Sequence, residues 1–115
     1  MDKQTKINNA IRTYVSPKYR LDKNSVRLNT HNKLPHEIAK TIKVYQLIEE
    51  GYEVYTEVIF KNGRRADVFV PEKMAVWEIL YSESELEALE KTSEYPEGLD
   101  IFLIPAEELI REVIK

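Results

Sequence analysis

The spacing of apolar residues along the chain becomes regular at Leu34 and stays regular to the end. Between Pro35 and Gly51, apolar residues recur every three or four positions, which is the period of one face of a helix. Proline suits the first turn of a helix and glycine its end, so one amphipathic helix is predicted over this stretch. Before Leu34 the chain is mostly polar, apart from a short predicted helix over residues 2–15 that Pro17 ends.

Three strands are predicted after this helix. Residues 52–60 alternate between two faces and are rich in β-branched and aromatic side chains, and residues 64–70 resume the pattern. Asn62-Gly63 between them is a strong hairpin signal, because both residues tolerate the positive φ of a type I′ turn. Residues 74–81 form a third strand after another turn, so the sequence predicts a three-stranded antiparallel meander.

The last part of the chain predicts a helix, a strand and a helix. Ser82 and Ser84 each stand three residues before a glutamate, which is the capping-box spacing that opens a helix. An apolar run over 99–104 predicts a fourth strand, which can lie parallel to the third because a helix connects them as a crossover. The predicted fold class is therefore α/β, a single domain with an αβββαβα core over residues 35–115 and a helical and loop extension over residues 1–34.

Composition narrows the class of protein. The chain has 115 residues, which suits one hydrophobic core. It has no cysteine, which excludes a disulfide framework and a thiolate metal site, and no apolar run is long enough to span a membrane. The first ten residues are polar and lack the apolar centre of a signal peptide. We therefore expect a cytoplasmic protein without a membrane partner.

Charge is distributed unevenly along the chain. Residues 1–35 hold eight Lys and Arg against two Asp, whereas the remainder is acidic, so the net charge of −3 hides a basic arm on an acidic body. A basic arm is one way to hold a polyanion such as nucleic acid. The alternative interpretation is a solvated helix and loop that happen to be basic.

Three carboxylates occupy positions that this topology would bring together. Glu37 lies at the start of the first long helix, Asp67 in the second strand and Glu78 in the third. Apolar residues flank both strand acids, and a carboxylate in such a run is costly to desolvate unless it binds a cation or a donor. Adjacent strands lie about 4.8 Å apart, so Asp67 and Glu78 could hold one divalent ion between them. Pairing of these two acids with Arg64 or Arg65 is the alternative, and Glu37 is also simply favoured at a helix start.

This succession of helix glutamate, strand pair, strand aspartate and third-strand glutamate resembles the PD-(D/E)XK nuclease superfamily, from Leu34 to the end of the chain. The resemblance implies a restriction-endonuclease-like core and metal-dependent hydrolysis of phosphodiester bonds in DNA. It implies catalytic roles for Glu37, Asp67 and Glu78. It also implies that Asp67, Glu78 and the backbone carbonyl of Ile79 bind Mg²⁺ or Mn²⁺. Branched or single-stranded DNA as substrate and a homodimer are both compatible with it.

One position departs from the family pattern. Leu80 stands two residues after the last acid, where the family carries a lysine that positions or activates the attacking water. The cation could come from elsewhere, with Lys40, Lys61, Arg65 and Lys73 as candidates. The alternative function is a catalytically inactive nucleic-acid-binding or assembly module that keeps the nuclease fold.

Four basic residues near the predicted site are candidates for contact with a nucleic acid backbone, namely Lys33, Lys40, Arg64 and Arg65. The planar guanidinium of arginine matches the geometry of phosphate, which favours the two arginines. His36 at the helix start is a further candidate for phosphate or metal contact, although a histidine is unremarkable there. A protein-interaction domain that uses the acidic stretch over 83–97 is a third class of function.

Overall fold

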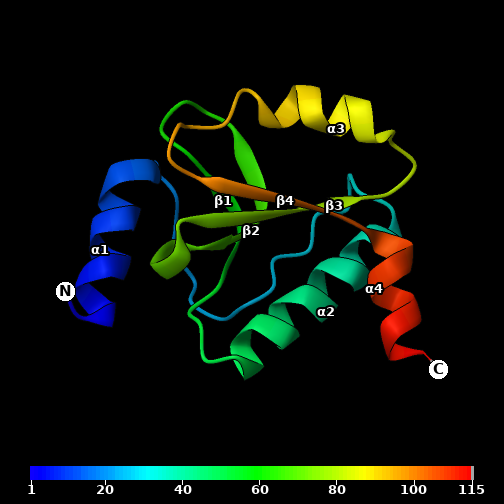
Figure 1. Cartoon of the computed structure of the whole chain (residues 1–115), viewed down its shortest axis with the longest axis horizontal. Helices are drawn as coiled ribbons and strands as arrows, with labels where there is room; N and C mark the ends of the chain where they lie inside the picture. The colour runs from blue at the N-terminus through cyan, green and yellow to red at the C-terminus, as the bar shows by residue number, and fades with distance from the viewer. Residues whose placement is uncertain (115) are drawn as a thin grey trace.

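One four-stranded sheet organises the fold, with α3 on one face and α2 and α4 on the other (Figure 1). The computed structural model describes residues 1–114, so Lys115, the last residue of the predicted core, lies outside the described residues. No helix in residues 1–114 is long and apolar enough to cross a membrane. The elements in chain order are α1 (Lys3–Tyr14), α2 (Leu34–Glu49), β1 (Tyr55–Ile59), β2 (Arg65–Val70), the short 3-10 helix η1 (Pro71–Lys73), β3 (Ala75–Leu80), α3 (Glu85–Thr92), β4 (Asp100–Pro105) and α4 (Ala106–Val113).

The strands lie in the order β1-β2-β3-β4. β1 pairs antiparallel with β2, and β2 antiparallel with β3, whereas β3 and β4 are parallel. The segment that contains α3 connects the two parallel strands, as a parallel pair requires. The predicted order of elements and the predicted direction of each strand are therefore confirmed, and the protein is an α/β domain with a mixed sheet.

The hairpin between β1 and β2 differs from the predicted type I′ turn. The Gly63 N–H donates to the Phe60 carbonyl at 2.9 Å, and Gly63 has a φ of +89° while Asn62 does not have a positive φ. The Asn62 side chain instead accepts a hydrogen bond from the Arg64 N–H at 3.1 Å. A longer loop that ends in one left-handed glycine spares Asn62 the strained conformation, which explains the difference.

The helix boundaries follow the predicted signals. Pro35 lies in the first turn of α2, and Gly51 follows its end with a φ of +93°, a conformation that glycine adopts without steric cost. Ser84 caps α3, where its side chain accepts a hydrogen bond from the Glu87 N–H at 3.1 Å. Local sequence is therefore sufficient to begin and end these helices.

Three buried apolar clusters hold the helices to the sheet. Val44 and Leu47 of α2 pack on one face against Val68 and Trp77. Full burial of each such side chain stabilises the fold by about 1.5–3 kcal/mol. The other face carries a second cluster around Phe60 and Phe69, and a third joins α4 to α2 through Ala39, Ile79, Ala106 and Leu109.

Residues 1–34 pack against the sheet rather than extending from it. Ile7 of α1 is buried, and Val15 forms an isolated antiparallel bridge with Phe60. Farther along, the Tyr19 hydroxyl donates to the Thr56 carbonyl. This basic segment therefore runs along the β1 edge and reaches the start of α2, where the candidate site lies.

Candidate functional site

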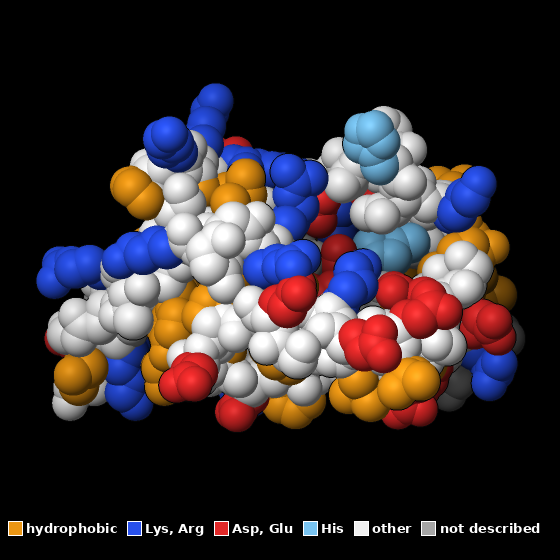
Figure 2. All heavy atoms as spheres, turned by 90° about the horizontal axis from the view of Figure 1, so that it is seen from above, with side chains coloured by type: hydrophobic (Ala, Val, Ile, Leu, Met, Phe, Trp, Pro, Cys, Tyr) orange, Lys and Arg blue, Asp and Glu red, His pale blue; other side chains and the backbone are white. Residues whose placement is uncertain are grey.

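A cleft of about 640 Å³ opens where β2 begins and β3 ends. Figure 2 shows acidic side chains inside a hollow that Lys, Arg and His side chains surround. The loop before α2, the first turn of α2, the β1–β2 hairpin, β3 and the region of α3 all contribute to its walls. The lining side chains include Lys33, His36, Arg65, Asp67, Glu78 and Tyr95.

Asp67 and Glu78 meet at the floor of this cleft. The regular pairing between β2 and β3 ends at Val68 and Trp77, one residue before the two acids. Side chains then continue the connection, because the Ile79 N–H donates to Asp67 Oδ2 at 2.9 Å. In return the Asp67 N–H donates to Glu78 Oε1 at 3.3 Å. Each carboxylate is thus fixed by the backbone of the neighbouring strand, and the two acids form what we call the acid pair.

The acid pair is electrostatically unfavourable as it stands. Burial raises the pKa of Glu78 well above its usual range, and the charge of Asp67 and a hydrogen bond between the two carboxyl groups raise it further. The Tyr95 hydroxyl donates to Glu78 Oε1 and opposes this shift in part. Burial and the charge of Glu78 also raise the pKa of Tyr95, so this phenol stays protonated and remains a donor. A cation between the two carboxyl groups would relieve the repulsion.

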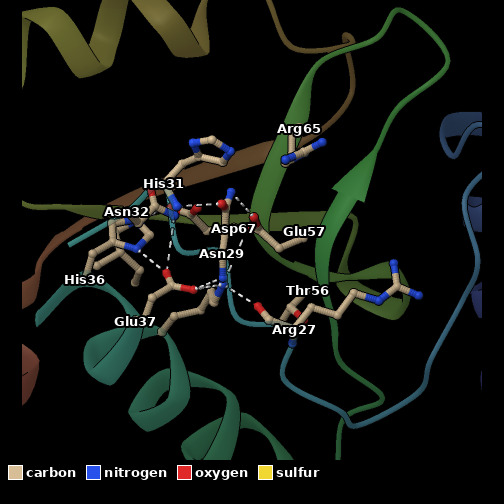
Figure 3. A network of polar contacts seen from close by, with 12 residues as sticks. Arg27, Asn29, His31, Asn32, His36, Glu37, Thr56, Glu57, Arg65 and Asp67 are labelled. Atoms are coloured by element: carbon tan, nitrogen blue, oxygen red, sulfur yellow. Dashed lines mark hydrogen bonds and ion pairs between the residues drawn. The ribbon is translucent and has the colours of Figure 1, made fainter. Parts of the chain in front are cut away.

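His36 bridges Asp67 and Glu37 (Figure 3). Its Nε2 lies 3.2 Å from Asp67 Oδ2 and its Nδ1 lies 2.7 Å from Glu37 Oε2. Burial alone would lower the pKa of His36, but hydrogen bonds and charge from Asp67, followed by those from Glu37, outweigh burial and raise it. An imidazolium donates from both nitrogens and therefore matches these two acceptors. His36, which is unremarkable in the sequence as a histidine at a helix start, is the cation in direct contact with the acid pair.

Glu37 faces a different set of partners from the one predicted. Its Oε1 accepts from the Asn29 N–H at 2.6 Å and from Lys40 Nζ at 2.7 Å. Its Oε2 contacts His36 and accepts from Asn32 Nδ2 at 3.3 Å. Burial raises the pKa of Glu37, but these donors, with Lys40 first, outweigh it and leave the pKa lowered. The carboxylate is therefore ionised and already surrounded by donors.

The three carboxylates that the topology was expected to bring together do not all meet. Asp67 and Glu78 meet, whereas His36 lies between Glu37 and Asp67, and in residues 1–114 no three His, Asp or Glu side chains are placed to hold a metal ion. The acid pair still offers the hard oxygen donors that Mg²⁺ prefers, and this ion usually retains several water ligands. Every hydrogen bond that another group of residues 1–114 donates to the acid pair ends on Asp67 Oδ2 or Glu78 Oε1. Oδ1 of Asp67 and Oε2 of Glu78 accept none from these groups. Ile79, the third predicted ligand, also lines the cleft.

Lys40 does not occupy the surface position that a nucleic-acid contact needs, which corrects that prediction. Its side chain is fully buried beneath the site. The ammonium donates to Glu37 Oε1 and to the Arg27 carbonyl at 2.6 Å, and lies 3.6 Å from Glu57 Oε2. Because the ammonium is enclosed by these acceptors, Lys40 serves as the internal counter-charge of two glutamates.

The other three residues considered as replacements for the missing motif lysine lie at different places in the fold. Arg65 lines the cleft. Lys61 donates to a backbone carbonyl of α1 at 2.6 Å, and Lys73 lies 5.1 Å from the centre of an aromatic ring. Leu80 itself lines a separate hollow of about 300 Å³ beside the end of β4. Of the four cations considered, only Arg65 is therefore placed at the site.

Three of the four predicted nucleic-acid contacts lie at the rim of the cleft, namely Lys33, Arg64 and Arg65. Arg64 is paired with Glu94. In the part of the chain that the structure describes, Lys33 and Arg65 form no ion pair with a carboxylate. These two cations are therefore free to contact an anionic ligand.

Glu57 carries the least expected backbone conformation of the site. It has a φ of +50° within β1, a region that costs a non-glycine residue about 1–3 kcal/mol. Its Oε1 accepts from Asn29 Nδ2 at 2.8 Å, and the side chain lines the cleft (Figure 3). In the sequence, Glu57 has the pattern of an ordinary solvated strand residue, so no local signal distinguishes it.

Comparison with other proteins adds no further guide to this site. No protein-family model matches the chain, and no curated protein or solved structure matches it significantly. The resemblance to the PD-(D/E)XK superfamily therefore stays a prediction from the sequence of this chain.

Proposed function

We propose that the protein is an intracellular, metal-dependent nuclease of the PD-(D/E)XK type that hydrolyses phosphodiester bonds in DNA. The observation that carries the proposal is the acid pair, in which burial and the charge of Asp67 raise the pKa of Glu78 at the floor of an open cleft. Two adjacent carboxylates of which only Asp67 contacts a cationic side chain, His36, are a suitable donor set for a hydrolytic metal ion. The αβββαβα order of elements supports a restriction-endonuclease-like core.

Each residue of the site has a role in this proposal. Asp67, Glu78 and the backbone carbonyl of Ile79 would hold Mg²⁺ or Mn²⁺. When bound, such an ion polarises a phosphoryl oxygen and lowers the pKa of a coordinated water. Arg65 and Lys33 bind the phosphates at the rim, where the planar fork of arginine can form two parallel hydrogen bonds.

His36 compensates for the absent motif lysine in charge. Its proton at Nε2 is donated to Asp67 Oδ2, so one negative charge of the acid pair is balanced by the protein. The same contact fixes the orientation of the carboxylate and leaves Oδ1 for a ligand. Glu37 holds the other ring nitrogen and therefore acts on Asp67 through His36.

Metal binding is tested by thermal unfolding of the purified protein with and without Mn²⁺ or Mg²⁺. A ligand at one hundred times its Kd stabilises the folded state by about 2.7 kcal/mol, which a melting curve resolves. We expect the rise in Tm to be lost in Asp67→Asn and in Glu78→Gln. Glu83→Gln, which changes an acid of the same cleft outside the acid pair, should keep it. An equal rise in all four proteins would show that the ion binds elsewhere.

Activity is tested on supercoiled, linear, single-stranded and branched DNA in Mg²⁺, Mn²⁺ or EDTA. We expect wild type and Glu83→Gln to cleave at least one substrate in metal and none in EDTA, and Asp67→Asn to cleave none. Metal binding without cleavage of any of the four substrates would remove the catalytic part of the proposal. The absence of both metal binding and cleavage would refute the proposal as a whole.

A catalytically inactive nucleic-acid-binding module is the second candidate. The observation that favours it is that both acids already have protein donors, since His36 contacts Asp67 and Tyr95 donates to Glu78. Such a module would retard DNA in EDTA with an affinity that falls as salt rises. Its binding should be weakened by Arg65→Ala and be insensitive to Asp67→Asn, which distinguishes it from the nuclease.

A further inference from the structure

The two edges of the sheet differ in how they are covered. Along the β1 edge, the Ser16 N–H donates to the Ile59 carbonyl at 2.9 Å, and the Arg27 N–H donates to Thr56 Oγ1 at 2.9 Å. The segment before α2 thus closes this edge. At the opposite edge, no backbone hydrogen bond in residues 1–114 reaches the outer side of β4. No other element lies in front of β4 in Figure 1.

The pairing of β4 with β3 determines which backbone groups point outward. The Asp100 N–H donates at 2.9 Å to the carbonyl that precedes β3. Because backbone groups alternate in direction along a strand, Phe102 and Ile104 also face β3. The N–H and C=O groups of Ile101 and Leu103 therefore point away from the sheet, where they have no partner within residues 1–114.

The middle of this edge strand, bounded by Asp100 and Pro105, lacks the features that usually prevent strand pairing. The residues between Asp100 and Pro105 are all apolar, and neither a lysine nor a bulge interrupts them. Phe102 stacks on Trp77 and is still 44% exposed. An exposed apolar edge with unpaired backbone groups is a template for another strand.

We propose that β4 pairs with β4 of a second copy of this chain, antiparallel about a two-fold axis at Phe102. In this register, Ile101 lies opposite Leu103 of the second copy, and each such pair exchanges both N–H···O=C bonds. Phe102 lies opposite Phe102 at the axis, in a position where close cross-strand side chains pack. Pro105, which has no N–H, falls outside the exchanged bonds.

The self-complementarity of β4 is the reason to assign the edge to a second copy. A two-fold interface requires that the same residues serve as both halves, and the outward groups of Ile101 and Leu103 satisfy each other in both directions. The axis is perpendicular to the sheet, so the sheet continues through both copies. This pairing does not depend on the proposed nuclease activity.

The first test uses the unmodified protein. Sedimentation gives the oligomeric state over a range of concentrations, and residue-resolved amide hydrogen exchange is followed over the same range. We expect the exchange of the Ile101 and Leu103 amides to slow as the dimer forms. The amides of Phe102 and Ile104 are bonded to β3 and serve as internal controls that are protected at every concentration. A monomer in which the Ile101 and Leu103 amides always exchange freely would overturn the proposal.

Two substitutions test the register. Leu103→Pro removes an outward N–H that has no partner within the described chain, whereas Leu103→Ala shortens the side chain and keeps the N–H. We expect Leu103→Pro to be monomeric and Leu103→Ala to dimerise. Phe102→Lys places like charges across the axis and should also give a monomer. This variant provides the test of the register if circular dichroism shows that Leu103→Pro does not fold. Dimerisation of Phe102→Lys as tight as that of wild type would overturn the proposal.

Discussion

Replacement of Lys40 by methionine tests the charge network beneath the candidate site. Methionine preserves most of the apolar length of the lysine side chain but removes the ammonium. In the wild type this ammonium lies 2.7 Å from Glu37 Oε1 and 3.6 Å from Glu57 Oε2. The variant therefore removes this ammonium from two nearly buried carboxylates, of which Glu37 keeps its contact with His36.

The expected loss of stability is large. Removal of one partner from a buried ion pair costs about 3–5 kcal/mol, because the remaining charge stays in a poorly solvated place. The side chains of Glu37 and Glu57 are 7% and 9% exposed, so solvent screening does not reduce this figure much. At roughly 4 °C per kcal/mol for a domain of this size, Lys40→Met should lower the Tm by about 12–20 °C.

The pH dependence of the loss separates charge from packing. The lowered pKa of Glu37 stabilises the wild type above the unfolded pKa of this carboxyl, and the benefit is lost as pH falls through the folded pKa. In Lys40→Met this carboxyl is buried without the ammonium that is the largest cause of its lowered pKa, so the deficit should shrink as protonation of the carboxyl at lower pH removes the buried charge. Thermal melts from pH 8 to pH 5 measure this trend.

Two further variants serve as controls. Lys40→Met/Glu37→Gln should be more stable than Lys40→Met alone, because the double variant removes a buried charge that has lost its ammonium partner. Lys43→Met changes a partly exposed lysine of the same helix and should cost no more than about 1 kcal/mol. A Lys40→Met protein that melts within about 4 °C of wild type, or a deficit that is the same at every pH, would refute the reasoning.

Two other predictions concern Glu78 and a glycine. The raised pKa of Glu78 means that the folded state binds this proton more tightly than the unfolded chain does, so stability falls as pH rises through the folded pKa. Glu78→Gln should therefore melt above wild type at pH 8 without metal, with an advantage that shrinks toward pH 5, and equal melting at both pH values would contradict this. At Gly98, with a φ of +92°, an added Cβ would overlap the Tyr14 hydroxyl, whereas at Gly63, with a φ of +89°, it would meet open space. Urea unfolding should show that Gly98→Ala costs more than the about 1–2 kcal/mol of backbone strain expected for Gly63→Ala, and equal costs would exclude the overlap.

The sequence by itself determined the secondary structure and the position of the acid pair. Pro35, Gly51 and Ser84 act within one helical turn of their own position, so the boundaries of α2 and α3 follow from local chemistry. Asp67 and Glu78 lie on consecutive antiparallel strands, and the short connection between these strands brings the two residues opposite each other. These features depend on residues that are close together in the chain, and the periodic pattern of apolar and polar positions reveals such relations.

Only the tertiary structure decided which groups surround the acid pair. The loop that carries Asn29 has no periodic signal, yet its backbone N–H donates to Glu37, the carboxylate that His36 links to Asp67. Lys40 is fully buried although lysine is usually exposed, because Glu37 one helical turn away and Glu57 of β1 enclose its ammonium. The left-handed conformation of Glu57 likewise has no local cause in its strand pattern.

The same distinction applies to the two edges of the sheet. The alternating pattern predicted the strands, but the coverage of the β1 edge depends on a polar segment that folds back from the N-terminal end. That β4 remains open follows from the order of the strands in space and from where the connecting segments pass. Contacts between residues far apart in the chain set both outcomes, and a one-dimensional pattern of apolar and polar positions does not contain them.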